Sequence, residues 1–332
     1  MGGSLLSDEF HHVSVLLEES VRGLVTATDG TYVDCTLGGG GHSHRIAEML
    51  TPAGRIIGID QDSEAIAAAS GRLADVSCHI DIVHDNFRNL EHILTEQDAP
   101  LVDGVLFDLG VSSHQLDDAA RGFSYMQDAP LDMRMDESAE LSAYDVVNTY
   151  SEAELDRIFH DYGEERWGRR IAQFIVRERA TQPIRTTGEL VNIICEAVPK
   201  AVRRAANGHP AKRIFQAIRI EVNDELGILE QTFRTAVHHL KPGGRIAIIT
   251  FHSLEDRIAK NTLRELARGC ICPPELPVCV CHHKPEIKLL GKAIKPSQEE
   301  TARNSRAKSA KLRLAEKLPA GEEGNGHAGY QA

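Results

Sequence analysis

The chain has 332 residues, enough for one large domain or two ordinary ones, and its 42% hydrophobic and 26% charged content is typical of a globular protein. No apolar stretch has the length of a membrane helix, and the first ten residues lack the basic and apolar regions of a signal peptide, so we expect a cytoplasmic protein without a membrane span. Its seven cysteines are then expected to be reduced thiols.

The net charge of −12 argues against nucleic-acid binding by the surface as a whole, but the charge is unevenly distributed. One stretch contains basic side chains and no acid: Lys200, Arg203, Arg204, Lys212, Arg213 and Arg219. Such a stretch is compatible with a polyanionic substrate, because the local field decides the contact. Ordinary solvated helix faces would have the same composition, so both interpretations stay open.

In chain order, the first distinctive segment is a glycine loop between a predicted strand, Thr31 to Asp34, and a predicted helix, His42 to Leu50. The glycines Gly38 to Gly41 predict a loop whose backbone can lie directly against a ligand. A Walker loop is excluded because no lysine precedes Lys200.

Two nucleoside ligands remain for this loop. A dinucleotide fingerprint would need a third glycine where Ser43 stands, which weakens NAD. S-adenosylmethionine carries an ammonium and a sulfonium, and the carboxylate of Asp34 suits those cations better than a pyrophosphate. The next predicted strand, Arg55 to Asp60, ends in an acid that can accept the ribose hydroxyls of either ligand.

A helix at Ser63 to Leu73 and strands at Ile80 to His84 and Val102 to Asp108 continue the alternation. This order predicts an α/β fold with a parallel, doubly wound sheet. Ligands bind at the carboxyl ends of such strands. We therefore expect one cleft to collect the residues that end the strands or follow them directly: Asp34, Asp60, Phe87 and Asp108.

After Gly110 the next convincing strand is Arg245 to Thr250, a gap far too long for one crossover. We predict an inserted helical domain there, with Thr186 and Thr187 as a helix start. The helices expected are Glu152 to Phe159, Arg166 to Arg179 and Glu189 to Val198, and a long amphipathic run from Ile214 to Leu240 is expected to return the chain to the sheet.

His252 and Ser253 follow the last predicted strand and are therefore expected in the same cleft. Beyond them lie two Cys-x-Cys pairs, Cys270 with Cys272 and Cys279 with Cys281, beside His282 and His283. These thiols suit either a structural zinc ion or buried, inert cysteines. We assign no metal to the predicted cleft.

Several long runs, in order, resemble the bacterial ribosomal RNA small-subunit methyltransferase H family, also called MraW. The runs are His12 to Leu17, Asp108 to Ser113, Gln115 to Asp118, Arg121 to Ser124, Pro130 to Asp136, Tyr162 to Arg166 and Phe251 to Arg257. The resemblance covers His11 to Lys317. It implies methyl transfer from S-adenosylmethionine to N4 of a cytidine in the decoding region of small-subunit (16S) ribosomal RNA, with free RNA or the assembled subunit as partner.

The resemblance implies a Rossmann-like class I methyltransferase sheet with an inserted all-helical domain. We place the S-adenosylmethionine-binding domain at 1–112 and 214–318, the substrate-recognition domain at 113–213 and a disordered tail at 319–332. By position, the family's cofactor contacts fall on Gly40, Gly41, His42, Asp60, Phe87, Asp108 and Gln115; to these our own reasoning adds Asp34 and Gly38.

The chemistry needs an acceptor that orients the N4 amine of cytosine, because its lone pair is delocalised into the ring. Asp108, His252 and Ser253 are the catalytic candidates for this role. The chain has Asp108-Leu-Gly-Val where many amino-methyltransferases have Asp/Asn-Pro-Pro-aromatic, which leaves the role of Asp108 open between catalysis and cofactor binding. Two other classes also stay open: a Rossmann oxidoreductase, and a ribosome-assembly protein that binds the cofactor without chemistry.

Overall fold

The computed structural model describes residues 14–205, 208–273, 276, 278–281 and 283–319. Within these residues, no helix is both long and apolar enough to cross a bilayer. The described chain divides into two compact units. The first comprises the residues up to Asp60, Glu64–Leu109 and those from Thr232 onward; the second comprises Gln61–Ser63 and Gly110–Gln231. The predicted tail beyond Pro319, and His12 and His282, lie outside the described residues.

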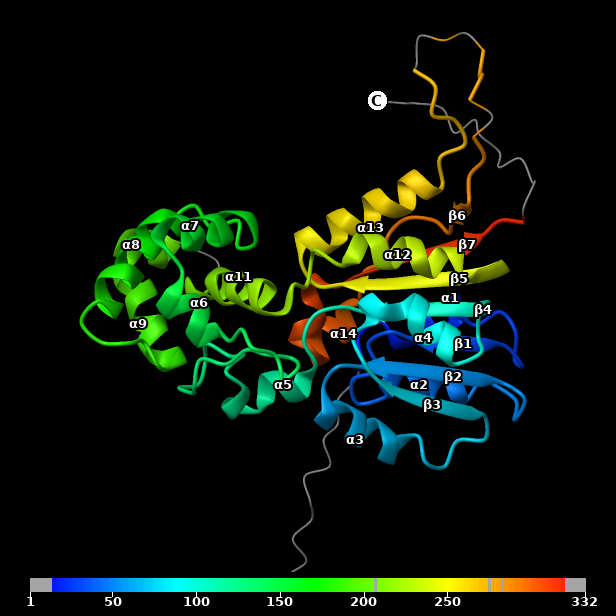
Figure 1. Cartoon of the computed structure of the whole chain (residues 1–332), viewed down its shortest axis with the longest axis horizontal. Helices are drawn as coiled ribbons and strands as arrows, with labels where there is room; N and C mark the ends of the chain where they lie inside the picture. The colour runs from blue at the N-terminus through cyan, green and yellow to red at the C-terminus, as the bar shows by residue number, and fades with distance from the viewer. Residues whose placement is uncertain (1–13, 206–207, 274–275, 277, 282, 320–332) are drawn as a thin grey trace, which may run out of the picture. The chain divides into compact units, whose positions relative to one another are not determined.

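The first unit is built on a seven-stranded sheet, which Figure 1 shows with its helices alongside. Its strands are β1 (Thr31–Asp34), β2 (Arg55–Asp60), β3 (His79–His84), β4 (Val102–Asp108), β5 (Leu240–Thr250), β6 (Ile287–Leu289) and β7 (Lys311–Lys317). The strand order is β3-β2-β1-β4-β5-β7-β6. Strands β1 to β5 pair in parallel, whereas β7 is antiparallel to both β5 and β6. The predicted parallel sheet is confirmed.

The helices of the first unit are α1 (Leu17–Leu24), α2 (Gly41–Ala47), α3 (Ser63–Arg72), α4 (Leu90–Glu96), α12 (Leu229–His238), α13 (Ser253–Leu266) and α14 (Gln298–Arg303), the units dividing within α3 and α12. Central strands are buried along most of their length because helices cover both faces of a parallel sheet. Tyr32, Ile57, Leu106 and Ile248 are among its fully buried side chains. The edge strand β3 is only half-buried.

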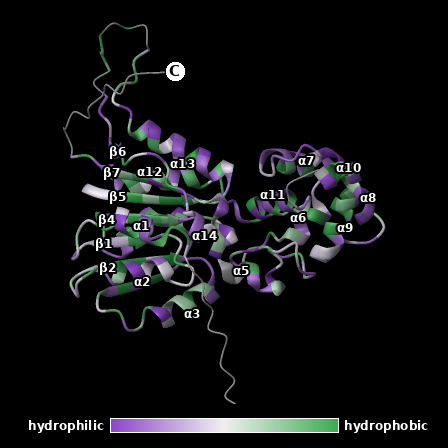
Figure 2. Ribbon diagram, turned by 180° about the vertical axis from the view of Figure 1, so that it is seen from behind, coloured by the Kyte–Doolittle hydropathy of each residue, from purple (hydrophilic) through white to green (hydrophobic). Residues whose placement is uncertain are grey.

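The second unit is helical, with α5 (Ser113–Asp117), α6 (Ala143–Thr149), α7 (Glu152–Asp161), α8 (Gly168–Arg179), α9 (Thr187–Ala197), α10 (Lys200–Ala205) and α11 (Ala211–Asn223). It has its own apolar core, which includes Phe159, Ile171, Leu190 and Ile218. In Figure 2 its helices carry both hydrophobic and hydrophilic stripes, as amphipathic helices do. The predicted start of α9 is confirmed, since Thr186 caps the helix by accepting from Glu189 N–H.

The division between the units differs from the predicted boundaries. We expected the insertion to end at 213, but α11 buries Ile214, Phe215 and Ile218 in the helical core, so it belongs to the second unit. The amphipathic run expected from Ile214 to Leu240 is divided between two helices, α11 and α12, and leads into β5. Asp224 adopts a left-handed conformation, with φ of 49°, and ends α11 before α12 begins.

Candidate active site at the carboxyl ends of the parallel strands

The glycine loop leaves β1 at Asp34 and enters α2 at Gly41. Gly38 and Gly40 have φ of 51° and 75°, a region that favours glycine. A side chain at Gly39 would meet no atom within 4 Å, whereas one at Gly41 would lie 2.2 Å from Ser14 Oγ. The loop therefore faces open space at Gly39 and packs against protein at Gly41, so the expected close approach to a ligand suits its first half best.

Asp60, at the end of β2, holds the loop directly. Its Oδ2 accepts from Gly38 N–H at 2.7 Å. A carboxylate has about four acceptor positions, so this contact is compatible with further hydroxyl donors. The loop and the predicted ribose acceptor therefore form one hydrogen-bonded unit.

Asp34 is 1% exposed and lies at the end of β1. Its Oδ2 accepts from Ser43 Oγ at 2.7 Å, and its Oδ1 accepts from Thr36 N–H at 3.2 Å. The pKa of Asp34 is raised to about 6, mainly by burial and to a smaller extent by the charge of Asp60, against the lowering effect of these hydrogen bonds. Asp34 thus fixes the shape of the loop from beneath and carries a charge at neutral pH.

Asp108 ends β4, and its two carboxyl oxygens differ in their surroundings. Its backbone N–H donates to Thr36 Oγ1 at 2.6 Å. Oδ2 lies 3.5 Å from His42 Nδ1, while Oδ1 is buried and has no hydrogen-bond partner among the described residues. Burial, followed by the nearby charges of Asp34 and Glu255, raises the pKa of Asp108 well above its usual range. An acceptor of this kind is poised for a donor from a ligand.

His42 lies in the first turn of α2 and is 4% exposed. Its Nε2 lies 3.2 Å from the carbonyl oxygen of Val15, which can only accept, so Nε2 carries a hydrogen. The other ring nitrogen, Nδ1, faces Asp108 Oδ2, and one proton can be shared between these two atoms. His42 orients Asp108 in this way.

His252 and Ser253 begin α13, directly after β5. The N–H groups of Phe251 and His252 donate to Glu255 Oε2 at 2.7 and 3.1 Å. His252 Nε2 lies 3.0 Å from Glu255 Oε1, and Nδ1 has no hydrogen-bond partner in the described part of the chain. Glu255 therefore organises the predicted strand end.

Two predicted cofactor contacts lie in different surroundings. Phe87 is half-buried in the first unit, and its ring packs edge-to-face on Phe107 with centroids 5.8 Å apart. Gln115 belongs to the second unit, where its Nε2 donates to Asp62 Oδ2 at 2.8 Å and its Oε1 accepts from Ser112 N–H at 3.0 Å. Arg121 also binds Asp62, at 3.0 Å. Gln115 thus has one donor contact and one acceptor contact within its own unit.

The supporting roles of three residues of this region were not predicted from the sequence: Thr36, Ser43 and Glu255. Each supports a carboxylate or a strand end through a side-chain hydrogen bond. All three belong to the motifs that flank the strands, and their hydroxyl or carboxyl groups were the available signal. The sequence does not say which of several polar groups in a loop turns inward.

The first unit offers three features that suit S-adenosylmethionine. Gly39 leaves open space beside the loop, Asp60 supplies an acceptor at the end of β2, and Asp34 supplies negative charge. Asp108 supplies an oxygen that has no hydrogen-bond partner among the described residues. Carboxylates suit a cationic nucleoside and would repel a pyrophosphate. The acceptors and the open space of this site therefore fit S-adenosylmethionine.

The strand order, with β7 antiparallel beside β5, is that of the Rossmann-like class I methyltransferases, and S-adenosylmethionine is the cofactor of this class. The family model of the MraW methylase family matches residues 9–318. The chain belongs to the MraW methylase family. The oxidoreductase alternative was therefore wrong.

Named relatives agree with this membership. Ribosomal RNA small subunit methyltransferase H of Clostridioides difficile (strain 630) is 57% identical over 311 residues, covering 93% of this chain and 100% of the relative. The protein of that name from Finegoldia magna is 53% identical and is covered to 99%. A crystal structure of an rRNA methylase from Streptococcus thermophilus aligns with 91% of this chain and 94% of its own, with 12% identity and a TM-score of 0.37, too low to carry an argument.

Proposed function

We propose that the protein methylates N4 of a cytidine in the decoding region of small-subunit ribosomal RNA. Family membership and relatives named ribosomal RNA small subunit methyltransferase H support the RNA substrate. The observation that carries the chemistry is the buried, unpaired Oδ1 of Asp108 at a strand end beside the glycine loop.

Bound S-adenosylmethionine supplies an electrophilic methyl group. Asp60 would accept the ribose hydroxyls, and the backbone of Gly38 and Gly39 would hold the methionine end. Asp34, which accepts from Thr36 N–H in the loop, would supply a negative charge to the cationic end of the cofactor. The remaining predicted cofactor contacts, Gly40, Gly41, His42, Phe87 and Gln115, stay part of the proposal.

The target base has to leave its stack before it can reach such a cleft. Asp108 Oδ1 then accepts one N4 hydrogen, which turns the nitrogen lone pair toward the methyl group. The transfer would form the N–CH3 bond and break the S–CH3 bond, so that S-adenosylhomocysteine is the leaving group. The methylated nitrogen would then be cationic and acidic, and its proton would pass to Asp108 or to the His252 and Ser253 pair. Removal of the proton before attack is unnecessary, so positioning is the dominant contribution.

Methyl labelling tests this function against the non-catalytic alternative. Small subunits are isolated from cells that lack the protein and incubated with it and radiolabelled S-adenosylmethionine. We expect label at one cytidine of the decoding region, identified as N4-methylcytidine by mapping the base. Absence of label from free RNA, partly assembled subunits and complete subunits alike would favour an assembly protein that binds without chemistry.

A further inference from the structure

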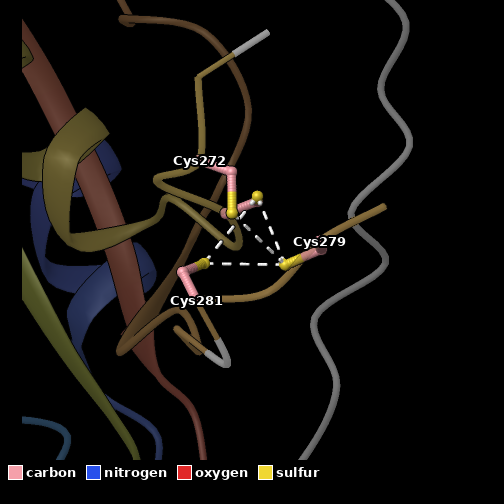
Figure 3. A group of neighbouring side chains, drawn as sticks. Cys272, Cys279 and Cys281 are labelled. Atoms are coloured by element: carbon pink, nitrogen blue, oxygen red, sulfur yellow. Dashed lines mark hydrogen bonds between the residues drawn. The ribbon is translucent and has the colours of Figure 1, made fainter. Parts of the chain in front are cut away.

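Four cysteine thiols converge in the segment between α13 and β6. Cys270, Cys272, Cys279 and Cys281 each place Sγ within 4.8 Å of the other three. Figure 3 shows the sulfurs of Cys272, Cys279 and Cys281 turned toward a common point. All four cysteines are free thiols, and none takes part in the proposed methyl transfer.

The spacing of these sulfurs is that of a tetrahedron around one metal ion. Sγ of Cys279 lies 3.4 Å from Cys270, 4.0 Å from Cys272 and 3.5 Å from Cys281, and Cys270 lies 3.8 Å from Cys281. Zinc bound to thiolates at about 2.3 Å gives tetrahedral edges of about 3.8 Å, within this range. A disulfide needs about 2.05 Å, and a cluster of several irons separates its outer thiolates further.

Hydrophobic burial does not explain why the thiols meet. The apolar residues between them point outward, since Ile271, Val278 and Val280 are 53%, 69% and 65% exposed. A short segment without a core of its own needs another source of folding free energy, and a bound metal ion supplies it in small domains.

Backbone donors surround the sulfurs as they do around metal-bound thiolates. Val280 N–H donates to Cys272 Sγ at 3.4 Å. Ile271 N–H and His283 N–H both donate to Cys281 Sγ at 3.5 Å. Such contacts orient ligands and disperse their negative charge.

We propose that Cys270, Cys272, Cys279 and Cys281 bind one zinc ion. The protein fills all four positions of the tetrahedron, so the ion is structural and has no open position for substrate or water. The site ties the two Cys-x-Cys pairs together and fixes the course of the chain between α13 and β6.

Metal analysis of the full-length protein, purified without an affinity tag that binds metal, tests the site. We expect about one zinc per chain, and cobalt in its place should give the intense visible absorption of a tetrahedral tetrathiolate. Cys279→Ser changes an exposed thiol, so it leaves no core cavity, and it should lower zinc occupancy by about tenfold or more. Cys195→Ser, a half-buried thiol in α9, is the matched control and should keep the zinc.

Three results would overturn the proposal. The first is wild-type protein that holds no stoichiometric zinc after loading and gel filtration while all four thiols react freely. The second is equimolar iron in place of zinc. The third is a pair of disulfides in protein purified under reducing conditions, which would indicate a redox pair. Because wild-type protein gives each readout, the conclusion does not depend on how well a variant folds.

Discussion

Asp60 has two roles in the proposed site, since it fixes Gly38 and is placed to bind the cofactor ribose. Losing a charged acceptor costs about 1.5 to 3 kcal/mol, so Asp60→Ala should weaken S-adenosylmethionine binding by roughly ten- to a hundredfold. Titration calorimetry measures this. Asp75→Ala, which removes an exposed acid of the same unit, should leave the affinity unchanged. Equal affinities in wild type and Asp60→Ala would remove Asp60 from the site.

Asp108 differs from Asp60 because its unpaired oxygen is assigned to the target amine. Asp108→Asn keeps the shape and one acceptor oxygen but removes the ionisable carboxyl group, so single-turnover methyl transfer should fall by about a hundredfold, or about 2.7 kcal/mol, with cofactor affinity nearly intact. Rapid-quench labelling and calorimetry on the same preparation separate the two effects. A proportional loss of affinity would make Asp108 a cofactor ligand only, and His252→Ala would then be the next variant to assay.

Asp34 makes stability depend on pH in a definite direction. Its pKa is 3.8 in a model peptide and about 6 in the fold, so the folded state binds the proton more tightly. Its contribution favours folding below about pH 4 and is lost as pH rises through 6. Asp34→Asn keeps an acceptor and does not titrate. Its unfolding free energy relative to wild type should therefore rise by about 1 kcal/mol between pH 5 and 7.5.

Urea unfolding at both pH values measures the difference. Asp256→Asn is the contrasting control, because the ion pairs of Asp256 with Lys311 and Arg313 lower its pKa. Its carboxyl is ionised throughout this range in both states, so this variant should lose the same stability at pH 5 and 7.5. If the unfolding free energies of Asp34→Asn and wild type differed by the same amount at both pH values, the raised pKa of Asp34 would be contradicted.

At the scale of elements, acids at strand ends were readable from sequence because they follow buried apolar runs. Asp34, Asp60 and Asp108 do end β1, β2 and β4. The end of α11 at Asp224 could not be predicted from the sequence, because the apolar spacing continues on both sides of this one left-handed residue. Strand β7 was also missed, because its alternating charged residues resemble a solvated segment. Side-chain hydrogen bonds such as that from Ser43 to Asp34 form only in the folded loop, so no periodic pattern in the sequence predicts them.

Helix α10 is the element best suited to the RNA-positioning surface that we propose in the second unit. Lys200 and Arg204 are exposed, whereas Arg219 is held by Glu225 in two contacts of 2.8 Å and is therefore a poor phosphate ligand. The double variant Lys200→Glu with Arg204→Glu should lower the slope of log affinity against log salt by about two, a little under one per phosphate contact.

Filter binding of small-subunit RNA across a salt series gives this slope. Arg22→Glu is a matched control, because Arg22 is exposed on α1 in the first unit and lies outside the proposed surface. An unchanged slope in the double variant would show that α10 presents an ordinary solvated face.

For the whole molecule, two separate cores predict two separately measurable stabilities. One core includes Leu106 and Ile249 in the first unit, and the other includes Ile171 and Leu190 in the second. Most proposed cofactor contacts lie in the first unit. A ligand that binds only the folded state stabilises the unit it binds, by about 2.7 kcal/mol at a hundred times its Kd. Amides of β1 and β4 should then exchange about a hundredfold more slowly with S-adenosylmethionine, and those of α8 and α9 at unchanged rates.

Hydrogen exchange followed by mass spectrometry resolves these elements, with NAD at the same concentration as the control ligand. NAD should slow neither unit, because the chain lacks the third glycine of a dinucleotide loop at Ser43. Equal slowing in α8, α9 and the sheet would mean that the units unfold as one. In that case cofactor binding would be coupled energetically to the second unit, in which α10 is proposed to position the RNA, and the salt dependence of RNA binding should change with cofactor.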